Sequence, residues 1–286
     1  MTNFILGCAN FFYEYGLKES EPLSYNINKI LDNAIENGVN DLDSALVYEN
    51  NKVPLSISNN ISTVINVGTK IGIKNIDIDK PKTISKLKEN LKKSLNLWGK
   101  DKFEYIYCHE IISTKNDLNK WQYIEDILKR DGFCKDTGIS IYHVEDLEIF
   151  KNIKLDRIQM PDNLYWQKDE KSLENVQRTR NNIDVRSIFL QGVIVNEPQK
   201  IKNKIPKSLL LHHSKIWQKF NSNKIKLYDL SLSYIKRRNY NNVVFGVENT
   251  EELNKFIRSF KKANELLDFS EFKYNEIDID PRTWGK

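Results

Sequence analysis

The chain has 286 residues, and its 44 Lys and Arg residues outnumber its 39 Asp and Glu residues, which gives a formal net charge of +5 at pH 7. Hydrophobic residues make up 40% of the chain and aromatic residues 11%, enough to fill a sizeable core, which excludes a disordered tail, a coiled coil and a collagen-like rod. The length allows either two domains of roughly 100–200 residues or one large barrel of roughly 250.

Short β-branched runs alternate with segments of helical periodicity along the whole chain. The eight predicted strands are residues 4–9, 39–43, 63–70, 103–109, 135–141, 157–160, 184–190 and 242–246. Apolar residues at helical spacing predict helices within residues 27–35, 84–95, 124–128 and 227–235. No Pro/Gly/Ser-rich linker or change of composition marks a boundary, so we expect a single domain over residues 1–286.

Strand followed by helix, repeated along the chain, predicts an α/β fold of the (β/α)8 TIM-barrel type, because parallel neighbouring strands need a crossover and helices must cover the outer face. The main competitor is a doubly wound open sheet. The turn after the first strand argues against that competitor, since it supplies only Gly7 where a G-x-G-x-x-G turn needs three glycines.

Three cysteines at unrelated spacings, Cys8, Cys108 and Cys134, argue against a disulfide scaffold or a Cys-ligated zinc site. The N-terminus has no signal-peptide pattern and no apolar window approaches the length of a membrane span, so we expect a cytoplasmic protein without a membrane partner. Basic residues are spread among acidic ones, which argues against a nucleic-acid partner. His212 and His213 lack companions at ligand spacing; we expect a surface or packing role and no metal.

Polar residues that could cooperate in proton transfer follow three consecutive predicted strands. Asp43 ends the second strand, with Tyr48 in the loop beyond it; Lys70 ends the third, and His109 the fourth. A nearby ammonium stabilises a phenolate, which would make Tyr48 a better acid, and a carboxylate would hold that ammonium ionised. His109 would orient a carbonyl substrate. Taken singly, each residue also fits a strand-end cap, an ion pair or a core histidine; the joint pattern favours chemistry.

At these positions the sequence resembles the aldo-keto reductases. Residues 38–48, GVNDLDSALVY, are similar to the family element G-[IV]-N-x-x-D-[ST]-A-x-x-Y, Thr69 and Lys70 to its strand-3 T-K, and residues 101–109 to D-x-x-D-x-x-x-x-H, with Glu104 in place of the second Asp. Weaker likeness extends over nearly the whole chain. The resemblance implies the reversible reduction of an aldehyde or ketone by a catalytic tetrad. The four residues of the tetrad would be Asp43, Tyr48, Lys70 and His109.

The resemblance also implies an NAD(P)H cofactor across the barrel mouth. Ser140 and Gln159 would lie near the carboxamide, and a segment containing Gly246 and Glu252 near the adenosine phosphate. Where many members have a Tyr stacking on the nicotinamide, this chain has Arg186. A guanidinium can stack its planar group or meet a phosphate or carboxylate, which suits an acidic or nucleotide-bearing substrate.

Charge near the expected adenosine end bears on the choice of cofactor. Members preferring the 2′-phosphate commonly carry Arg or Gln at the position matching Glu252 and often Asn at that matching Phe256. Glu248 and Glu252 would repel a phosphate dianion, whereas a carboxylate accepts hydrogen bonds from a ribose 2′-hydroxyl. We therefore expect NAD(H) to bind at least as well as NADP(H).

Residues 186–192 and 280–284 are similar to a bacterial subgroup often encoded beside surface-polysaccharide genes, which points to a sugar or nucleotide-sugar carbonyl as the small-molecule substrate. The rival interpretation is a non-catalytic nucleotide-binding sensor or scaffold, favoured by Arg186 and by the unusual loop at residues 49–54. A lyase using Lys70 as a Schiff-base amine would leave the spacing of Tyr48 unexplained. We expect a monomer or a weak homo-oligomer.

Overall fold

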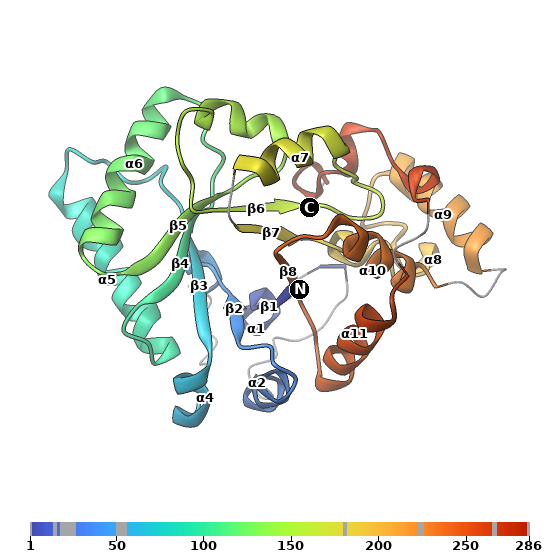
Figure 1. Ribbon diagram of the computed structural model, residues 1–286, viewed down its shortest axis with the longest axis horizontal. Helices are drawn as coiled ribbons and strands as arrows, with labels where there is room; N and C mark the ends of the chain where they lie inside the picture. Colours follow the sequence, from blue (N-terminus) through green and yellow to red (C-terminus); the bar gives the residue numbers. More distant parts are fainter. Residues whose placement is uncertain are drawn as a thin grey trace.

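A computed structural model describes residues 2–13, 16–17, 27–49, 56–179, 182–221, 226–264 and 268–284. Eight parallel strands form a closed barrel in chain order, each hydrogen-bonded to the next and β8 to β1 (Figure 1). The strands are β1 (Asn3–Gly7), β2 (Asp41–Asp43), β3 (Asn66–Ile71), β4 (Phe103–Cys108), β5 (Cys134–Ser140), β6 (Arg157–Pro161), β7 (Asn182–Arg186) and β8 (Asn242–Phe245). This closed parallel barrel confirms the (β/α)8 prediction; the single-domain organisation stays a prediction.

The longer helices cover the outside of the barrel (Figure 1), whereas the short α1 and α3 lie at its mouth. The α-helices of the described residues are α1 (Ala9–Phe12), α2 (Ile27–Glu36), α3 (Leu46–Glu49), α4 (Asn59–Val64), α5 (Pro81–Trp98), α6 (Lys115–Arg130), α7 (Glu170–Thr179), α8 (Pro198–Ile201), α9 (Lys207–Asn221), α10 (Leu227–Arg238) and α11 (Thr250–Lys262). The four helices predicted from apolar spacing are α2, α5, α6 and α10. Local chemistry sets their ends: the Thr114 side chain caps α6, and Gly99 ends α5 with a left-handed φ of 62°.

Two predicted strand boundaries are wrong by more than two residues, and the others lie within two residues of the observed ends. The third strand begins at Asn66 and not at residue 63, because Thr63 and Val64 complete α4, where the Thr63 hydroxyl donates to the backbone carbonyl of Asn60. The seventh strand ends at Arg186 and not at residue 190, because Ser187 has a φ of 57°, which no strand residue adopts. In both places β-branched or apolar residues, which are typical of strands, belong to another structure: the end of α4 in one case and the loop after β7 in the other.

Two tyrosines of β4 fill the barrel interior, and glycines on the neighbouring strands make room for them. Gly68 of β3 pairs with Tyr105, and a Cβ on Gly68 would lie 1.9 Å from the Tyr105 ring. Gly138 of β5 pairs with Tyr107, and its Cβ would lie 2.4 Å from the carbonyl oxygen of Arg157. The two tyrosines therefore fill the barrel interior, and the two positions opposite them have no room for a side chain larger than that of glycine.

A buried polar network occupies the barrel towards the N-terminal ends of the strands. The Asp184 carboxylate accepts hydrogen bonds from the Tyr107 hydroxyl at 2.6 Å, from Nδ2 of Asn242 at 2.7 Å and from the Arg157 guanidinium, whose NH2 lies 2.9 Å from both oxygens. Arg157 and Asn242 are the first residues of their strands. This network closes the end of the barrel opposite to the predicted chemistry.

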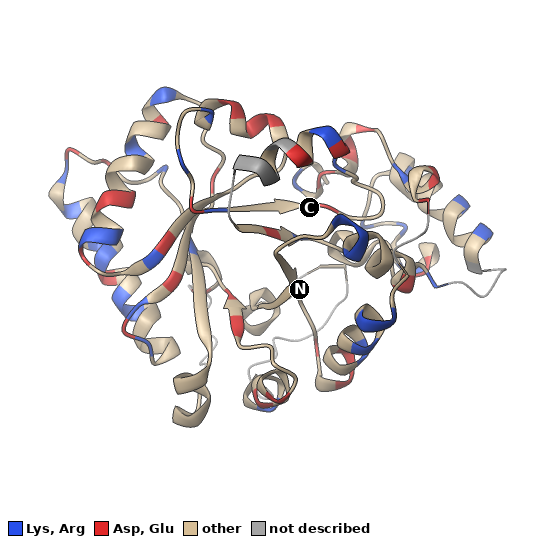
Figure 2. Ribbon diagram, in the orientation of Figure 1, with Lys and Arg blue, Asp and Glu red and all other residues tan. Residues whose placement is uncertain are grey.

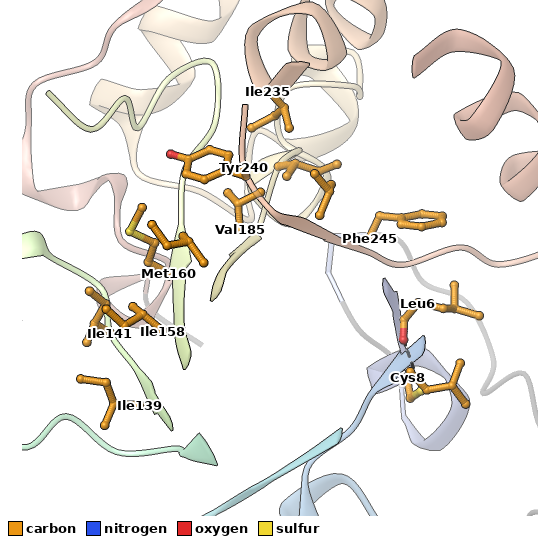
Figure 3. Close-up of a cluster of buried hydrophobic side chains, with 14 of the residues drawn as sticks. Leu6, Cys8, Ile139, Ile141, Ile158, Met160, Val185, Ile235, Tyr240 and Phe245 are labelled. Carbon is orange, nitrogen blue, oxygen red and sulfur yellow. Dashed lines mark hydrogen bonds between the residues drawn. The ribbon is translucent and has the colours of Figure 1, made fainter. Parts of the chain in front are cut away.

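The main apolar core lies between the strands and the covering helices. Figure 3 shows Ile139 of β5, Ile158 and Met160 of β6 and Val185 of β7, together with Ile235 of α10; all are buried. Charged residues of both signs alternate over the outer helices in the view of Figure 2. Across the part of the chain that the structure describes, no helix is long and apolar enough to cross a membrane.

Candidate active site

All nine residues predicted for the site line one cavity of about 610 Å³ at the C-terminal ends of the strands. They are Asp43, Tyr48, Lys70, His109, Ser140, Gln159, Arg186, Gly246 and Glu252. Strand periodicity explains the convergence, because alternate residues of a strand face the same side and the last inward positions open onto the mouth. Their roles stay predictions, while their placement in one cavity is a property of the structure.

A buried ion pair lies at the floor of this cavity. The Lys70 ammonium donates to Oδ2 of Asp43 and, at 3.1 Å, to the backbone carbonyl of Ser44. The other carboxylate oxygen of Asp43 accepts a hydrogen bond of 3.1 Å from Nε2 of Gln159. Lys70 and Asp43 are 3% and 5% exposed, so neither charge has water to balance it and each depends on the other.

Tyr48 and His109 lie above this pair. The Lys70 ammonium is 5.8 Å from the centre of the Tyr48 ring, and the ring centres of Tyr48 and His109 are 6.1 Å apart in an edge-on arrangement. Tyr48 belongs to the four-residue helix α3, and His109 directly follows β4, where its backbone N–H donates to the carbonyl of Ile71. Burial, helped by the charges of Lys70 and Arg186, lowers the pKa of His109 to about 3, so the imidazole is neutral at pH 7.

Arg186 reaches the cavity from the end of β7. Its NH2 donates to the backbone carbonyl of Ile141 at 3.1 Å, its NH1 to the Ser187 hydroxyl at 3.3 Å, and its guanidinium carbon lies 4.3 Å from the centre of the Tyr142 ring. The Arg282 guanidinium lies 3.5 Å from the same ring centre, which brings the C-terminal segment against the barrel mouth. Tyr142 therefore contacts two cations, from β7 and from the C-terminal segment.

The opposite side of the cavity is formed by β8 and the start of α11. A Cβ on Gly246 would lie 3.2 Å from Oδ1 of Asn10, whose Nδ2 donates to the carbonyl of Val247, so this glycine allows the ends of β1 and β8 to approach. Glu252 lies in the first turn of α11, and its Oε2 accepts a hydrogen bond of 3.0 Å from the backbone N–H of Glu248. Glu252 thus helps to cap the helix and also lines the cavity.

Comparison with known proteins agrees with this geometry. The family model described as the aldo/keto reductase family matches residues 4–277. The chain belongs to the aldo/keto reductase family. That membership implies NAD(P)H-dependent reduction of a carbonyl group. The comparison with curated proteins found no match.

Solved aldo-keto reductase structures share the fold. One, assigned to the family and from Pseudomonas aeruginosa, superposes with a TM-score of 0.61 at 17% sequence identity, covering 91% of this chain and 90% of that one. An aldo-keto reductase from Bacillus halodurans, in its holo form, gives a TM-score of 0.65 at 17% identity, covering 95% of this chain and 89% of that one. At these identities the likeness supports the barrel alone.

One side chain of this aldo/keto reductase has hydrogen-bonding capacity suited to the nicotinamide end of NAD(P). Gln159 is fully buried, and while its Nε2 donates to Asp43, its Oε1 has no hydrogen-bond partner. An unsatisfied buried acceptor is costly, and a carboxamide N–H is a donor that would satisfy it. Ser140, which pairs directly with Gln159 in the β5–β6 register, lines the same cavity. The residues present therefore fit the cofactor that the family implies.

Sequence reasoning missed two parts of the site. The loop after β7 lines the cavity with Ser187, Gln191 and Gly192 in left-handed conformations, at φ values of 57°, 53° and 96°. Gly192 was the available signal, because glycine favours that region, but Ser187 and Gln191 carry none. The second is Glu49, a half-buried carboxylate that follows Tyr48 in α3. The remainder of the unusual loop, residues 50–54, lies outside the described residues.

The two adjacent histidines have packing roles. The Nδ1 atom of His213 lies 2.8 Å from the Tyr165 hydroxyl and its Nε2 lies 2.8 Å from the carbonyl of Asn196, while Nε2 of His212 lies 3.0 Å from the carbonyl of Phe272. His213 is fully buried. Within the described segments, no group of three or more His, Cys, Asp or Glu side chains is arranged to hold a metal ion.

Proposed function

We propose that this aldo/keto reductase is an active enzyme that reduces an aldehyde or ketone to an alcohol with NAD(P)H. The observation that carries the proposal is the buried Lys70–Asp43 pair directly beneath Tyr48, with neutral His109 on the same cavity. A protein that only bound a nucleotide would have no use for a buried ion pair under a phenol, since such a pair costs desolvation energy.

Each tetrad residue has a proposed role. Tyr48 protonates the alkoxide that develops on the substrate, and Lys70 stabilises the resulting phenolate by its charge. Asp43 keeps Lys70 ionised and in place through their direct contact. His109, being neutral, carries one N–H that can donate to the substrate carbonyl and orient it. The nicotinamide, when bound, supplies the hydride that the carbonyl carbon receives.

For the cofactor, we propose Ser140 and Gln159 as the carboxamide contacts and the segment with Gly246 and Glu252 as the adenosine contact. The acceptor Oε1 of Gln159 supports the first assignment, and the position of Glu252 on the cavity supports the second. We also propose that NADH binds at least as well as NADPH, because Glu252 would repel a 2′-phosphate. Fluorescence titration with both reduced nucleotides tests this; tenfold tighter binding of NADPH would contradict it.

We propose a sugar carbonyl, free or nucleotide-linked, as the substrate class. Its support is the likeness of residues 186–192 and 280–284 to bacterial members encoded beside polysaccharide genes; the family match and the structural neighbours add nothing to it. A cytoplasmic location remains our proposal, supported by three buried cysteines that are all free. We also propose that the protein is a monomer or a weak homo-oligomer and that it has no nucleic-acid or membrane partner.

Steady-state and binding measurements on one variant separate the enzyme from the sensor alternative. The wild type should oxidise NADH or NADPH in the presence of small aldehydes, and Lys70→Met should lower kcat at least about 100-fold, as expected for loss of assisted proton transfer. Nucleotide affinity should change little. A wild type that binds nucleotide tightly but turns over none of a broad panel of aldehydes, ketones and sugars would favour the sensor.

A further inference from the structure

Arg186 is a cation in the cavity without a carboxylate partner. Among the ion pairs of the described residues, Lys70 is matched by Asp43 and Arg282 by Asp280, but none includes Arg186. Its contacts within the described residues are a carbonyl, a hydroxyl and an aromatic ring, all uncharged. Within the described segments, no carboxylate neutralises the positive charge that Arg186 brings to the inner part of the cavity.

The guanidinium is nevertheless held in a fixed place. Its guanidinium carbon lies 4.3 Å from the centre of the Tyr142 ring, and its hydrogen bond to the carbonyl of Ile141 anchors the other side of the group. Those contacts use two of the five N–H donors of an arginine, which leaves the remaining donors for a ligand. Tyr142 is itself held by Arg282, whose Nε donates to Asp280 at 2.8 Å. A pre-oriented guanidinium is suited to bidentate binding of a carboxylate or phosphate.

The charge of Arg186 acts at the reacting end of the cavity. It is one of the causes, after burial and Lys70, that lower the pKa of His109, and after burial it also helps to lower the pKa of Lys168 to about 8. Lys168 lies behind Tyr142, with its ammonium 2.7 Å from the Tyr142 carbonyl oxygen. An anion bound by Arg186 would lie close to the carbonyl that His109 orients and would reduce this concentration of positive charge.

We propose that Arg186 binds an anionic group of the substrate, a carboxylate or a phosphate monoester, so that the preferred substrates are acidic aldehydes or ketones. This inference rests on the proposed reductase function and narrows its substrate class. The uncharged contacts of Arg186 argue for it, and so does the neutral state of His109, because the imidazole then brings no second charge to compete for the anion.

Two matched pairs of aldehydes test the proposal. The first is 4-carboxybenzaldehyde against methyl 4-formylbenzoate, and the second is glyceraldehyde 3-phosphate against glyceraldehyde. In at least one pair, wild-type kcat/KM should favour the anion by about tenfold or more, as expected for charge-assisted hydrogen bonds. Arg186→Met should remove this preference and Arg186→Lys should keep part of it. The matched control is Lys255→Met, which removes another cation that lines the cavity and should keep the preference.

Other outcomes overturn the proposal. A wild type that shows no preference in either pair has no substrate anion site. If Arg186→Met leaves the preference intact but weakens NADH binding tenfold by fluorescence titration, Arg186 serves the cofactor phosphates. If the wild type reduces none of the four aldehydes, the reductase proposal fails, and calorimetric titration with 4-(hydroxymethyl)benzoate decides the anion site separately. Binding that is lost in Arg186→Met would support the site, and equal or absent binding would overturn it.

Discussion

Replacement of Glu49 tests how the tetrad is held in place. Glu49 ends α3, directly after Tyr48, and its Oε1 accepts hydrogen bonds of 2.9 Å from the Ser44 hydroxyl and 2.9 Å from Nε1 of Trp98. Ser44 follows Asp43, and Trp98 is the fully buried last residue of α5. One carboxylate therefore ties the end of β2, the helix that carries Tyr48, and α5 together.

Glu49→Ala leaves both donors without an acceptor in a buried place. At about 1–3 kcal/mol for each unsatisfied group, the free energy of unfolding should fall by about 2–6 kcal/mol. Glu49→Gln keeps an acceptor oxygen and should lose about 1 kcal/mol. The kcat of Glu49→Ala should also fall by at least about tenfold, because small displacements of a catalytic group are costly. Urea denaturation and steady-state kinetics measure both effects.

Burial also raises the pKa of Glu49, which adds a dependence on pH. The folded protein then binds this proton more tightly than the unfolded chain does, so stability is lost as pH rises above the ordinary Glu value. Glu49→Gln should remove that loss. A Glu49→Ala protein within about 0.5 kcal/mol of the wild type, or a Glu49→Gln protein as unstable as Glu49→Ala, would show that the Glu49 hydrogen bonds do not hold these elements together.

Three further substitutions test the fold and its charges. The pKa of about 3 for His109 lies below that of an unfolded histidine, so the free energy of unfolding should fall as pH drops from about 6.5 towards 3. His109→Gln should lessen this fall when stability is measured by urea denaturation at each pH. An equal fall in the wild type and in the variant would contradict this cause. Gly68→Ala should cost about 3 kcal/mol by its clash with Tyr105, and Tyr105→Leu should recover part of this; additive losses would exclude the clash. Arg157→Met should cost about 3–5 kcal/mol by leaving Asp184 unpaired, and adding Asp184→Asn should recover part; an undiminished loss in that double variant would contradict an electrostatic cause.

The fold was predictable because its signals are local. Most strands contain a short run of β-branched or apolar residues, and each of the four predicted helices buries a stripe of apolar residues against the barrel. The two largest boundary errors, at residues 63 and 190, fall where β-branched or apolar residues form a helix end and a left-handed turn. Backbone strain of the kind found at Ser187 leaves no mark in composition.

The tetrad positions were predictable for a related reason. Asp43, Lys70 and His109 lie at the C-terminal ends of consecutive strands, and a parallel barrel brings these strand ends together. The bond from Glu49 to Trp98 and the contact of Arg282 with Tyr142 join segments far apart in the chain, and no spacing rule predicts such contacts. The sequence could therefore indicate where the chemistry lies but not what holds it in place.

Tyr48→Phe is the most direct test of the proposed function, since it removes one oxygen atom from the group assigned to protonate the substrate. Single-turnover reduction of an aldehyde by the variant, with NADH affinity measured on the same sample, separates chemistry from binding. The single-turnover rate should lie at least about 100-fold below that of the wild type, with the NADH Kd within about threefold. A variant that reduced the aldehyde at the wild-type rate would contradict the assignment of Tyr48 as the general acid.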